Sequence, residues 1–201
     1  MRPKAGGPNS TTDRFGGSTL QPIKFESVPF AKPVVIHVVV MGVAGCGKSA
    51  VGQRIAVQLN LPLIEGDDFH PASNIAKMQQ GVALTDTDRA DWLRTLALEL
   101  CKRPKGAVLT CSALKTAYRD TLRSGVPALH FVHLAIPQAE SLRRVANRPG
   151  HFYPPCLVAS QFEALQDPAS EPHVLVLDGQ MALSVLAAVA TDWLKSARQE
   201  V

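Results

Sequence analysis

The chain alternates between short apolar runs and longer segments in which apolar residues recur every three to four positions. The first run, VVIHVVVM at residues 34–41, is continuous and rich in β-branched residues, as in a strand that is buried on both faces of a parallel sheet. Shorter runs predict four further strands at residues 61–66, 107–114, 128–135 and 173–178. The apolar pattern therefore predicts five strands.

Helices are predicted between these strands. Apolar residues four positions apart predict a helix over residues 48–60, directly after the first strand. A longer helix is predicted over residues 85–103, capped by Thr85 or Asp86, with Trp92 in its apolar stripe. Further helices are predicted at residues 73–80, 115–124, 138–147 and 157–166, and from about residue 182. This alternation predicts an α/β fold, a five-stranded parallel sheet with helices on both faces.

The first 33 residues differ from the rest of the chain. They are rich in Gly, Pro, Ser and Thr and have no hydrophobic period, so we expect a disordered tail at 1–33 before a domain at 34–201. The tail has five basic and two acidic residues, which is +3 of the net charge of +4. A transit peptide would explain the basic bias, but the acids and the missing amphipathic pattern favour a plain tail.

Composition narrows the class of protein. The body is nearly neutral and has no evident basic face with stacking aromatics, so we expect no nucleic-acid partner. The four cysteines form no CxxC pair and no metal-binding spacing, which favours free thiols and a cytoplasmic protein. The longest apolar runs are too short to span a membrane, so we expect no membrane partner.

The strongest motif is GVAGCGKS, which fits G-x-x-x-x-G-K-S between the first strand and the first helix. In such a loop the backbone N–H groups face a phosphate, Lys48 reaches the outer phosphates and Ser49 ligates Mg²⁺. The motif predicts a bound nucleotide and Mg²⁺. The predicted nucleotide-binding residues of the loop are Gly42, Val43, Ala44, Gly45, Cys46, Gly47, Lys48 and Ser49.

The acceptor is suggested by the stretch GDDFHP, which follows the second strand. In an open parallel sheet ligands bind at the carboxyl ends of the strands, so Asp67 or Asp68 can face the transferred phosphate. The third strand ends without an aspartate, so an acid after the second strand must orient the acceptor hydroxyl, the metal, or both. Asp67 is thus also a candidate metal ligand beside Ser49.

Residues 66–93, GDDFHPASNIAKMQQGVALTDTDRADWL, resemble the gluconokinase signature GDxxHPxxNxxKMxxGxxLxDxDRxxWL. CSALKTAYRDTLR, RPGHF and QFEALQDP extend the resemblance, which covers residues 36 to about 178. The chain is similar to short, shikimate-kinase-like gluconokinases. The resemblance implies a P-loop kinase with a helical substrate-binding insertion and a lid at about 143–156. It also implies a homodimer that phosphorylates D-gluconate at its 6-hydroxyl with ATP and feeds the pentose phosphate pathway.

The resemblance also suggests roles for single residues. Asp67 matches the acid of the signature and is our catalytic candidate, whereas Asp68 occupies a free position and should point elsewhere along an extended segment. His70 either binds sugar hydroxyls or fixes its loop. Arg89 has the planar fork that suits the gluconate carboxylate, although an internal pair with Asp86 is an alternative.

Other polar residues are candidates by position. Asn74 and Lys77 lie on one helix face toward the acceptor, although Lys77 can equally be solvated, and Lys115 and Arg119 lie one turn apart after the third strand. The predicted substrate-binding residues are Asp67, His70, Asn74, Lys77, Arg89, Lys115 and Arg119. Arg144 and Arg148 match lid arginines that close over ATP, and with Lys48 and Asp67 they form the predicted catalytic set. The rival interpretation is another small-molecule kinase, such as shikimate kinase.

Overall fold

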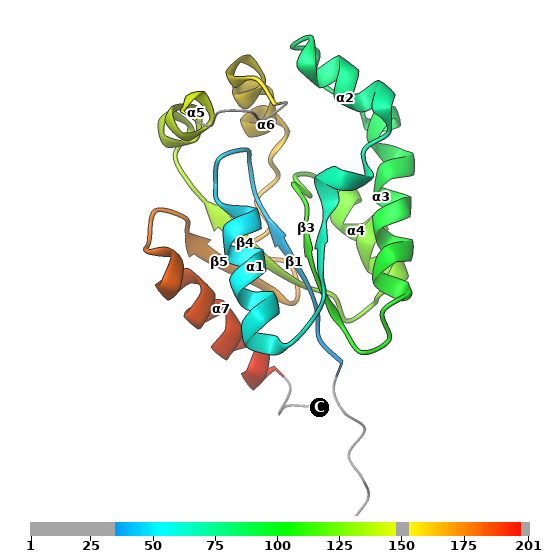
Figure 1. Ribbon diagram of the computed structural model, residues 1–201, viewed down its shortest axis with the longest axis vertical. Coiled ribbons are helices and arrows are strands. Elements are labelled where there is room, and N and C mark those ends of the chain that lie inside the picture. The colour runs from blue at the N-terminus through cyan, green and yellow to red at the C-terminus, as the bar shows by residue number, and fades with distance from the viewer. Residues whose placement is uncertain (1–34, 148–152, 198–201) are drawn as a thin grey trace, which may run out of the picture. The chain divides into compact units, whose positions relative to one another are not determined.

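The computed structural model describes residues 35–147 and 153–197, all of which belong to the compact unit Pro33–Val201 (Figure 1). The predictions for the tail at 1–33, for Arg148 and for the centre of the lid lie outside these residues. No helix in the described ranges is both long and apolar enough to cross a bilayer.

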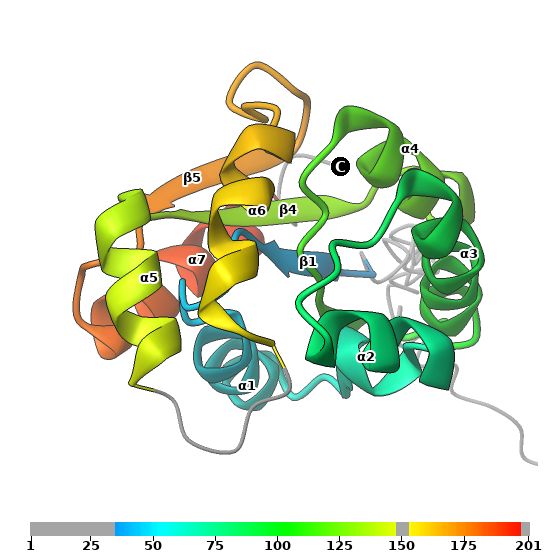
Figure 2. The ribbon, with the colours of Figure 1, turned by 90° about the horizontal axis from the view of Figure 1, so that it is seen from above.

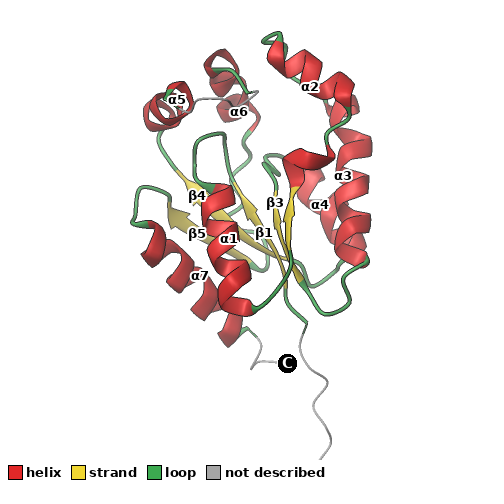
Figure 3. Ribbon diagram, viewed as in Figure 1, coloured by secondary structure: helices red, strands yellow, loops and turns green. Residues whose placement is uncertain are grey.

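A single parallel sheet of five strands forms the centre of the fold (Figure 3). Its order is β2-β3-β1-β4-β5, so that β1 is central and β2 and β5 are edge strands. The register places Val39 of β1 opposite Leu109 of β3 and Phe131 of β4. The strands are β1 (His37–Met41), β2 (Leu63–Glu65), β3 (Ala107–Thr110), β4 (His130–Ala135) and β5 (Val174–Asp178). The predicted α/β fold class is confirmed.

Helices cover both faces of this sheet: α1 and α7 lie on one face, α3 and α4 on the other (Figure 1). The helices are α1 (Lys48–Leu59), α2 (Ala72–Gln79), α3 (Asp86–Cys101), α4 (Thr116–Gly125), α5 (Gln138–Ala146), α6 (Val158–Ala164) and α7 (Leu183–Ser196). Two 3₁₀ turns, η1 (Gly66–Phe69) and η2 (Pro155–Leu157), precede α2 and α6.

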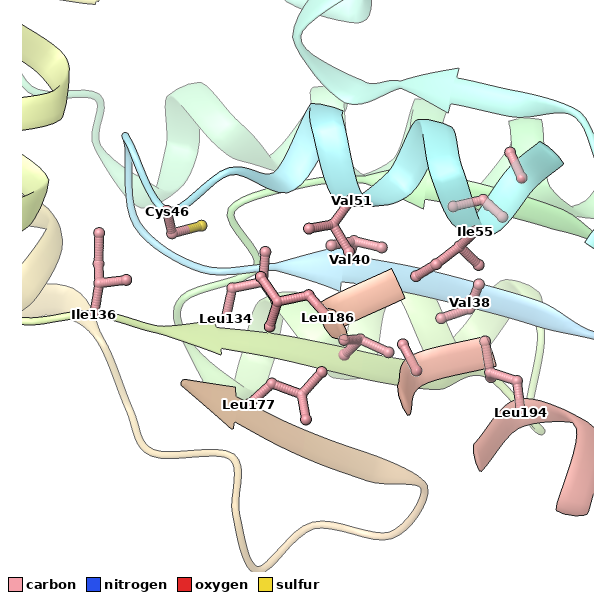
Figure 4. Close-up of a cluster of buried hydrophobic side chains, with 14 of the residues drawn as sticks. Val38, Val40, Cys46, Val51, Ile55, Leu134, Ile136, Leu177, Leu186 and Leu194 are labelled. Carbon is pink, nitrogen blue, oxygen red and sulfur yellow. The ribbon is translucent and has the colours of Figure 1, made fainter. Parts of the chain in front are cut away.

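Strand β1 is apolar along its whole length because its side chains enter two different cores. Val38 and Val40 pack on the α1 and α7 side, where they meet residues such as Ile55 and Leu186 (Figure 4). Val39 belongs to the other cluster, between the sheet and helices α3 and α4. Successive side chains of a strand point to opposite faces, so a central strand covered on both faces needs apolar residues at every position.

Local sequence signals set several element boundaries. Thr85 is the N-cap of α3: its side chain accepts from the Asp88 N–H, and the Asp88 carboxylate accepts from the Thr85 N–H, a capping box. Of the two predicted caps, Thr85 is therefore the observed one. One local prediction was wrong, because residues 66–69 form the turn η1 and not an extended segment.

Candidate active site

A cavity of about 500 Å³ opens at the carboxyl ends of the strands. Seen from above, α2 lies on one side of this edge of the sheet and α5 and α6 on the other (Figure 2). The phosphate loop contributes Ala44, Gly45, Gly47, Lys48 and Ser49 to its lining. Asp67, His70 and Arg89 line it from the segment after β2. Most of the predicted phosphate loop and three of the seven predicted acceptor residues thus share one cavity.

The phosphate loop has the conformation that its glycines allow. Gly47, with φ 99°, caps the helix α1, which begins at Lys48, so free N–H groups of the first helical turn face the cavity. Lys48 Nζ donates to the Val43 carbonyl at 3.0 Å, which holds the ammonium group beside the loop. Gly42, Val43 and Cys46 do not line the cavity. Cys46 is buried and fills the space next to Gly42, where an added Cβ would lie 2.9 Å from its sulfur.

Glu65 is a site residue that our sequence analysis missed. Its Oε2 accepts hydrogen bonds from Ser49 Oγ at 3.1 Å and from Thr110 Oγ1 at 2.5 Å. The parallel register explains the contact, because Glu65 and Thr110 are partners at the ends of β2 and β3. Thr110 ends the third strand, which has no aspartate, and Glu65 supplies a carboxylate from the neighbouring strand. The spacing of Glu65 and Asp67, two acids at the end of one strand, was the available signal.

The turn η1 separates the two aspartates. Both side chains are exposed, but only Asp67 belongs to the lining of the cavity. Trp92 Nε1 donates to the carbonyl of Gly66 at 2.8 Å and so anchors the start of the turn on helix α3. Gly66 is required here, since an added Cβ would lie 2.2 Å from the carbonyl oxygen of Thr110. The turn is therefore fixed both to the sheet and to α3.

His70 stacks on the indole ring of Trp92, with ring centroids 4.1 Å apart and an interplanar angle of 14°. Burial lowers the pKa of His70 to about 4, although the carboxylate of Asp67 acts in the opposite direction. The imidazole is thus neutral near pH 7. Its buried Nδ1 has no hydrogen-bond partner among the described residues, so the ring can still accept or donate a hydrogen bond within the cavity.

Arg89 faces the cavity without pairing with Asp86. Its Nη1 donates to the carbonyl oxygens of Leu84 at 2.5 Å and Thr85 at 3.4 Å. Asp86 instead accepts from Lys115 Nζ, at 2.7 and 2.8 Å, and from the hydroxyl of Tyr118. Two backbone carbonyls thus orient the guanidinium group of Arg89.

Asn74, Lys77 and Lys115, which we predicted to bind substrate, are not in the lining of the cavity. Asn74 Nδ2 donates to the carbonyl of Asp88 at 2.8 Å, and Lys77 Nζ lies 2.6 Å from the carboxylate of the same residue. Both side chains therefore join α2 to the start of α3. Lys115 is held by Asp86 in the same region. These residues support the wall that carries Arg89 and His70.

The prediction that Arg119 meets the substrate is not supported by its position. Its side chain is fully buried, and its Nε lies 3.0 Å from each carboxylate oxygen of Glu171. Nη1 donates to the carbonyls of Ala113 and Leu114. Helical spacing from Lys115 suggested a shared face, but the turn after β3 directs Arg119 into the protein. Its role in the described structure is to fix that turn.

The predicted lid begins on α5. Arg144, in the last turn of this helix, lines the cavity. Arg144 Nε lies 2.5 Å from Glu140, and Nη1 donates to the carbonyls of Gly179 at 3.1 Å and Gly45 at 3.4 Å. It therefore contacts the phosphate loop directly. On the far side of residues 148–152, Tyr153, Ser160 and Gln161 also line the cavity, and our sequence analysis named none of them.

Comparison with known proteins identifies the family. The thermoresistant gluconokinase of Escherichia coli (strain K12) is 40% identical over 164 residues, which cover 80% of this chain and 94% of that protein. The chain belongs to the gluconokinase family. A solved gluconokinase structure from Sinorhizobium meliloti 1021 is 39% identical, covers 84% of this chain and 97% of that chain, and has a TM-score of 0.77. The predicted resemblance is thus confirmed.

Broader comparisons agree with this gluconokinase assignment. A family model described as an AAA domain matches residues 38–172, which contain the phosphate loop and the acceptor segment. Shikimate kinase from Aquifex aeolicus vf5 is only 16% identical, with a TM-score of 0.55 over 81% of this chain and 98% of that chain. That likeness shows a shared fold alone. The rival assignment to shikimate kinase is therefore not favoured.

Proposed function

We propose that this gluconokinase-family protein transfers the terminal phosphate of ATP to the 6-hydroxyl of D-gluconate, giving 6-phospho-D-gluconate and ADP. The observation that carries the proposal is the shared cavity, whose lining includes residues of the phosphate loop together with Asp67 and Arg89. Both reactants would then meet in one site, as direct transfer requires. Membership of the gluconokinase family supports the choice of acceptor.

The oxygen groups of Ser49, in the first turn of α1, and of Glu65, at the end of β2, are of the kind that binds Mg²⁺. The hydroxyl of Ser49 and the carboxylate of Glu65 are hard oxygen donors 3.1 Å apart, next to the loop that would hold the phosphates. We propose that Ser49 ligates the ion and that Glu65 orients it, directly or through water. When bound, the ion would neutralise charge on the transferring phosphate. Asp67, two residues on, is a second candidate for this role.

Asp67 is the proposed catalytic carboxylate. It would accept a hydrogen bond from the 6-hydroxyl of gluconate and hold that oxygen in line with the transferred phosphate. Lys48, at the base of the phosphate loop, would stabilise charge on the outer phosphates. Arg144 would act from the lid side, where it already contacts Gly45. Arg148 is proposed as a second lid arginine by resemblance alone.

The acceptor would be fixed by Arg89 and His70. The guanidinium group of Arg89 can form a bidentate pair with the gluconate carboxylate, because two backbone carbonyls orient it from behind. The neutral ring of His70 would exchange a hydrogen bond with a sugar hydroxyl. Asn74 and Lys77 would act indirectly, by holding α2 against α3, and Lys115 would do so by bonding Asp86 at the start of α3.

We further propose that the protein is a cytoplasmic homodimer. The dimer is an expectation from the family. The cytoplasmic location is supported by the cysteines Cys46, Cys101, Cys111 and Cys156, all of which are free thiols in the structure.

The test of function is ADP release measured with a coupled assay over gluconate, shikimate, glycerate and nucleoside monophosphates. We expect turnover that requires D-gluconate and Mg²⁺. Equal turnover with shikimate or a nucleoside monophosphate would overturn the assignment of the acceptor. Size-exclusion chromatography with light scattering would test the dimer separately.

A further inference from the structure

Both backbone polar groups of Ala44, in the outer half of the phosphate loop, are held by side chains from distant helices. The carbonyl oxygen of Ala44 accepts from Ser141 Oγ of α5 at 2.7 Å. Its N–H donates to Gln161 Oε1 of α6 at 2.6 Å. No role in the reaction has so far been given to Ser141 or Gln161. Together they form what we call the Ala44 clamp.

The clamp is part of tight packing between the loop and α5. Ser141 is fully buried. Gly45 has φ +75°, and a Cβ at this position would lie 3.0 Å from the Ser141 carbonyl oxygen and 3.2 Å from a methyl group of Val145. Only glycine therefore permits this close approach of helix and loop. The neighbouring carbonyl of Gly45 is contacted by Arg144, also from α5.

We propose that Gln161 is a positioning residue for the phosphoryl donor. By accepting from the Ala44 N–H, its carboxamide turns this N–H toward α6 and away from the nucleotide. The loop conformation that follows presents the later N–H groups of the loop and of the first turn of α1 to the phosphates. Phosphate binding by a loop of this kind depends on the direction of successive N–H groups, so loss of one backbone anchor weakens the whole cradle.

Gln161 also lies next to the predicted lid. Its side chain lines the same cavity as that of Tyr153, the first described residue after the segment 148–152. Ser141 lies on α5, which ends at Ala146, directly before that segment. The two halves of the clamp thus come from the two sides of the lid. Nucleotide affinity is therefore set in part by the helices that carry the lid, and not by the phosphate loop alone.

The experiment measures ADP binding, with Mg²⁺ and without gluconate, by isothermal titration. The variant Gln161→Met has a side chain of similar length but no acceptor for the Ala44 N–H. We expect its Kd for ADP to rise about tenfold, because a backbone donor loses its partner. The matched control is Glu163→Gln, an exposed position two residues further along α6, which should leave the Kd unchanged.

Two other outcomes would contradict the inference. An unchanged Kd with a lowered Tm would make Gln161 a residue of stability alone. Tighter ADP or ATP binding would mean that its oxygen occupies the place of a phosphate oxygen. If Gln161→Met does not fold, Ser141→Ala removes the other half of the clamp and should raise the Kd in the same direction. The inference rests on the proposed nucleotide site, and failure of the unmodified protein to bind ADP would contradict that site itself.

Discussion

The hydroxyl of Ser49 and the carboxylate of Glu65 are joined by a hydrogen bond of 3.1 Å across the gap between the phosphate loop and the edge strand β2. Thr110, from the strand between them, holds the same carboxylate oxygen. A negative charge therefore stands beside the proposed metal-ligating hydroxyl, although β3 ends without an aspartate. We therefore expect the metal dependence of the enzyme to be sensitive to a residue outside the phosphate loop.

The variant Glu65→Gln keeps the size of the side chain and removes its charge. We expect the Mg²⁺ concentration for half-maximal activity to rise about tenfold, because a neutral amide attracts a divalent cation less than a carboxylate does. A Mg²⁺ titration at saturating ATP and gluconate measures the change. Asp68→Asn, which removes an exposed acid nearby, is the control. Identical Mg²⁺ curves for Glu65→Gln and the unmodified protein would remove Glu65 from the metal site.

The two aspartates of η1 should differ in their effect on turnover. Asp67→Asn should lower kcat by about 10²-fold or more, because a group that orients the acceptor hydroxyl acts mainly in the transition state. Asp68→Asn should cost little, since this side chain, unlike that of Asp67, lies outside the cavity lining. Steady-state kinetics at saturating ATP separate the two. Should Asp68→Asn be the inactive variant, the assignment is wrong, and rescue of Asp67→Asn by excess Mg²⁺ would indicate metal orientation.

The role of Arg89 is tested by Arg89→Lys. A lysine keeps the charge but cannot reproduce two parallel N–H bonds to a carboxylate. We expect the KM for gluconate to rise about tenfold, with a smaller change in the KM for ATP. Arg94→Lys is the comparison, because Arg94 lies on the same helix, pairs with exposed Asp91 and does not line the cavity. An effect of Arg89→Lys on ATP alone would place Arg89 outside the acceptor site.

His70 should make stability depend on pH below neutrality. Its pKa is lowered from 6.5 to about 4 in the folded protein, so the unfolded chain binds more protons between these values. The contribution of His70 to stability is therefore complete above about pH 6.5 and falls as the pH is lowered toward 4. Urea unfolding from pH 4 to 8 should show a shallower pH dependence in His70→Asn than in the unmodified protein. Parallel curves would contradict the buried neutral imidazole.

Arg119→Met should affect folding and not the KM of either substrate. Its guanidinium group is fully buried and paired with Glu171, so removal leaves a largely buried carboxylate with fewer partners. We expect a loss of about 3–5 kcal/mol in the free energy of unfolding by urea. Arg123→Met, which removes a more exposed partner of Glu171, should cost less. If folded Arg119→Met had a raised KM for gluconate, Arg119 would take part in substrate binding despite its burial.

The order of strands and helices was predictable because each element carries its own local pattern. The β-branched run of β1 and the capping box at Thr85 are examples. The direction of polar side chains was less predictable. Lys115 and Arg119 are one turn apart in the sequence, yet one bonds Asp86 near the surface and the other is buried against Glu171. Those partners are separated from them by 29 and 52 residues, so no local pattern records the pairing.

Glu65 and Gln161 illustrate the same limit within the site. In the sequence, Glu65 is only a residue near the end of a predicted strand. Its contact with Thr110 depends on the register of β2 and β3. In the sequence, Gln161 is only one polar residue of a short helix. Its hydrogen bond with Ala44 joins residues 117 positions apart. Motifs locate residues that act through their own loop, such as Lys48 and Ser49. They do not locate residues that act through contacts made by the folded chain.

The position of β2 at the edge of the sheet gives the two halves of the active site different freedom to evolve. The nucleotide loop follows the central strand β1, which is paired on both sides, so its geometry is locked by two neighbours. The acceptor segment, residues 66–85, follows a strand that is paired on one side only. Insertions or replacements there would disturb one ladder and leave the phosphate loop in place. New acceptor preferences are therefore best sought by exchanging this segment between relatives, while the remainder of the chain, including the phosphate loop, is kept unchanged.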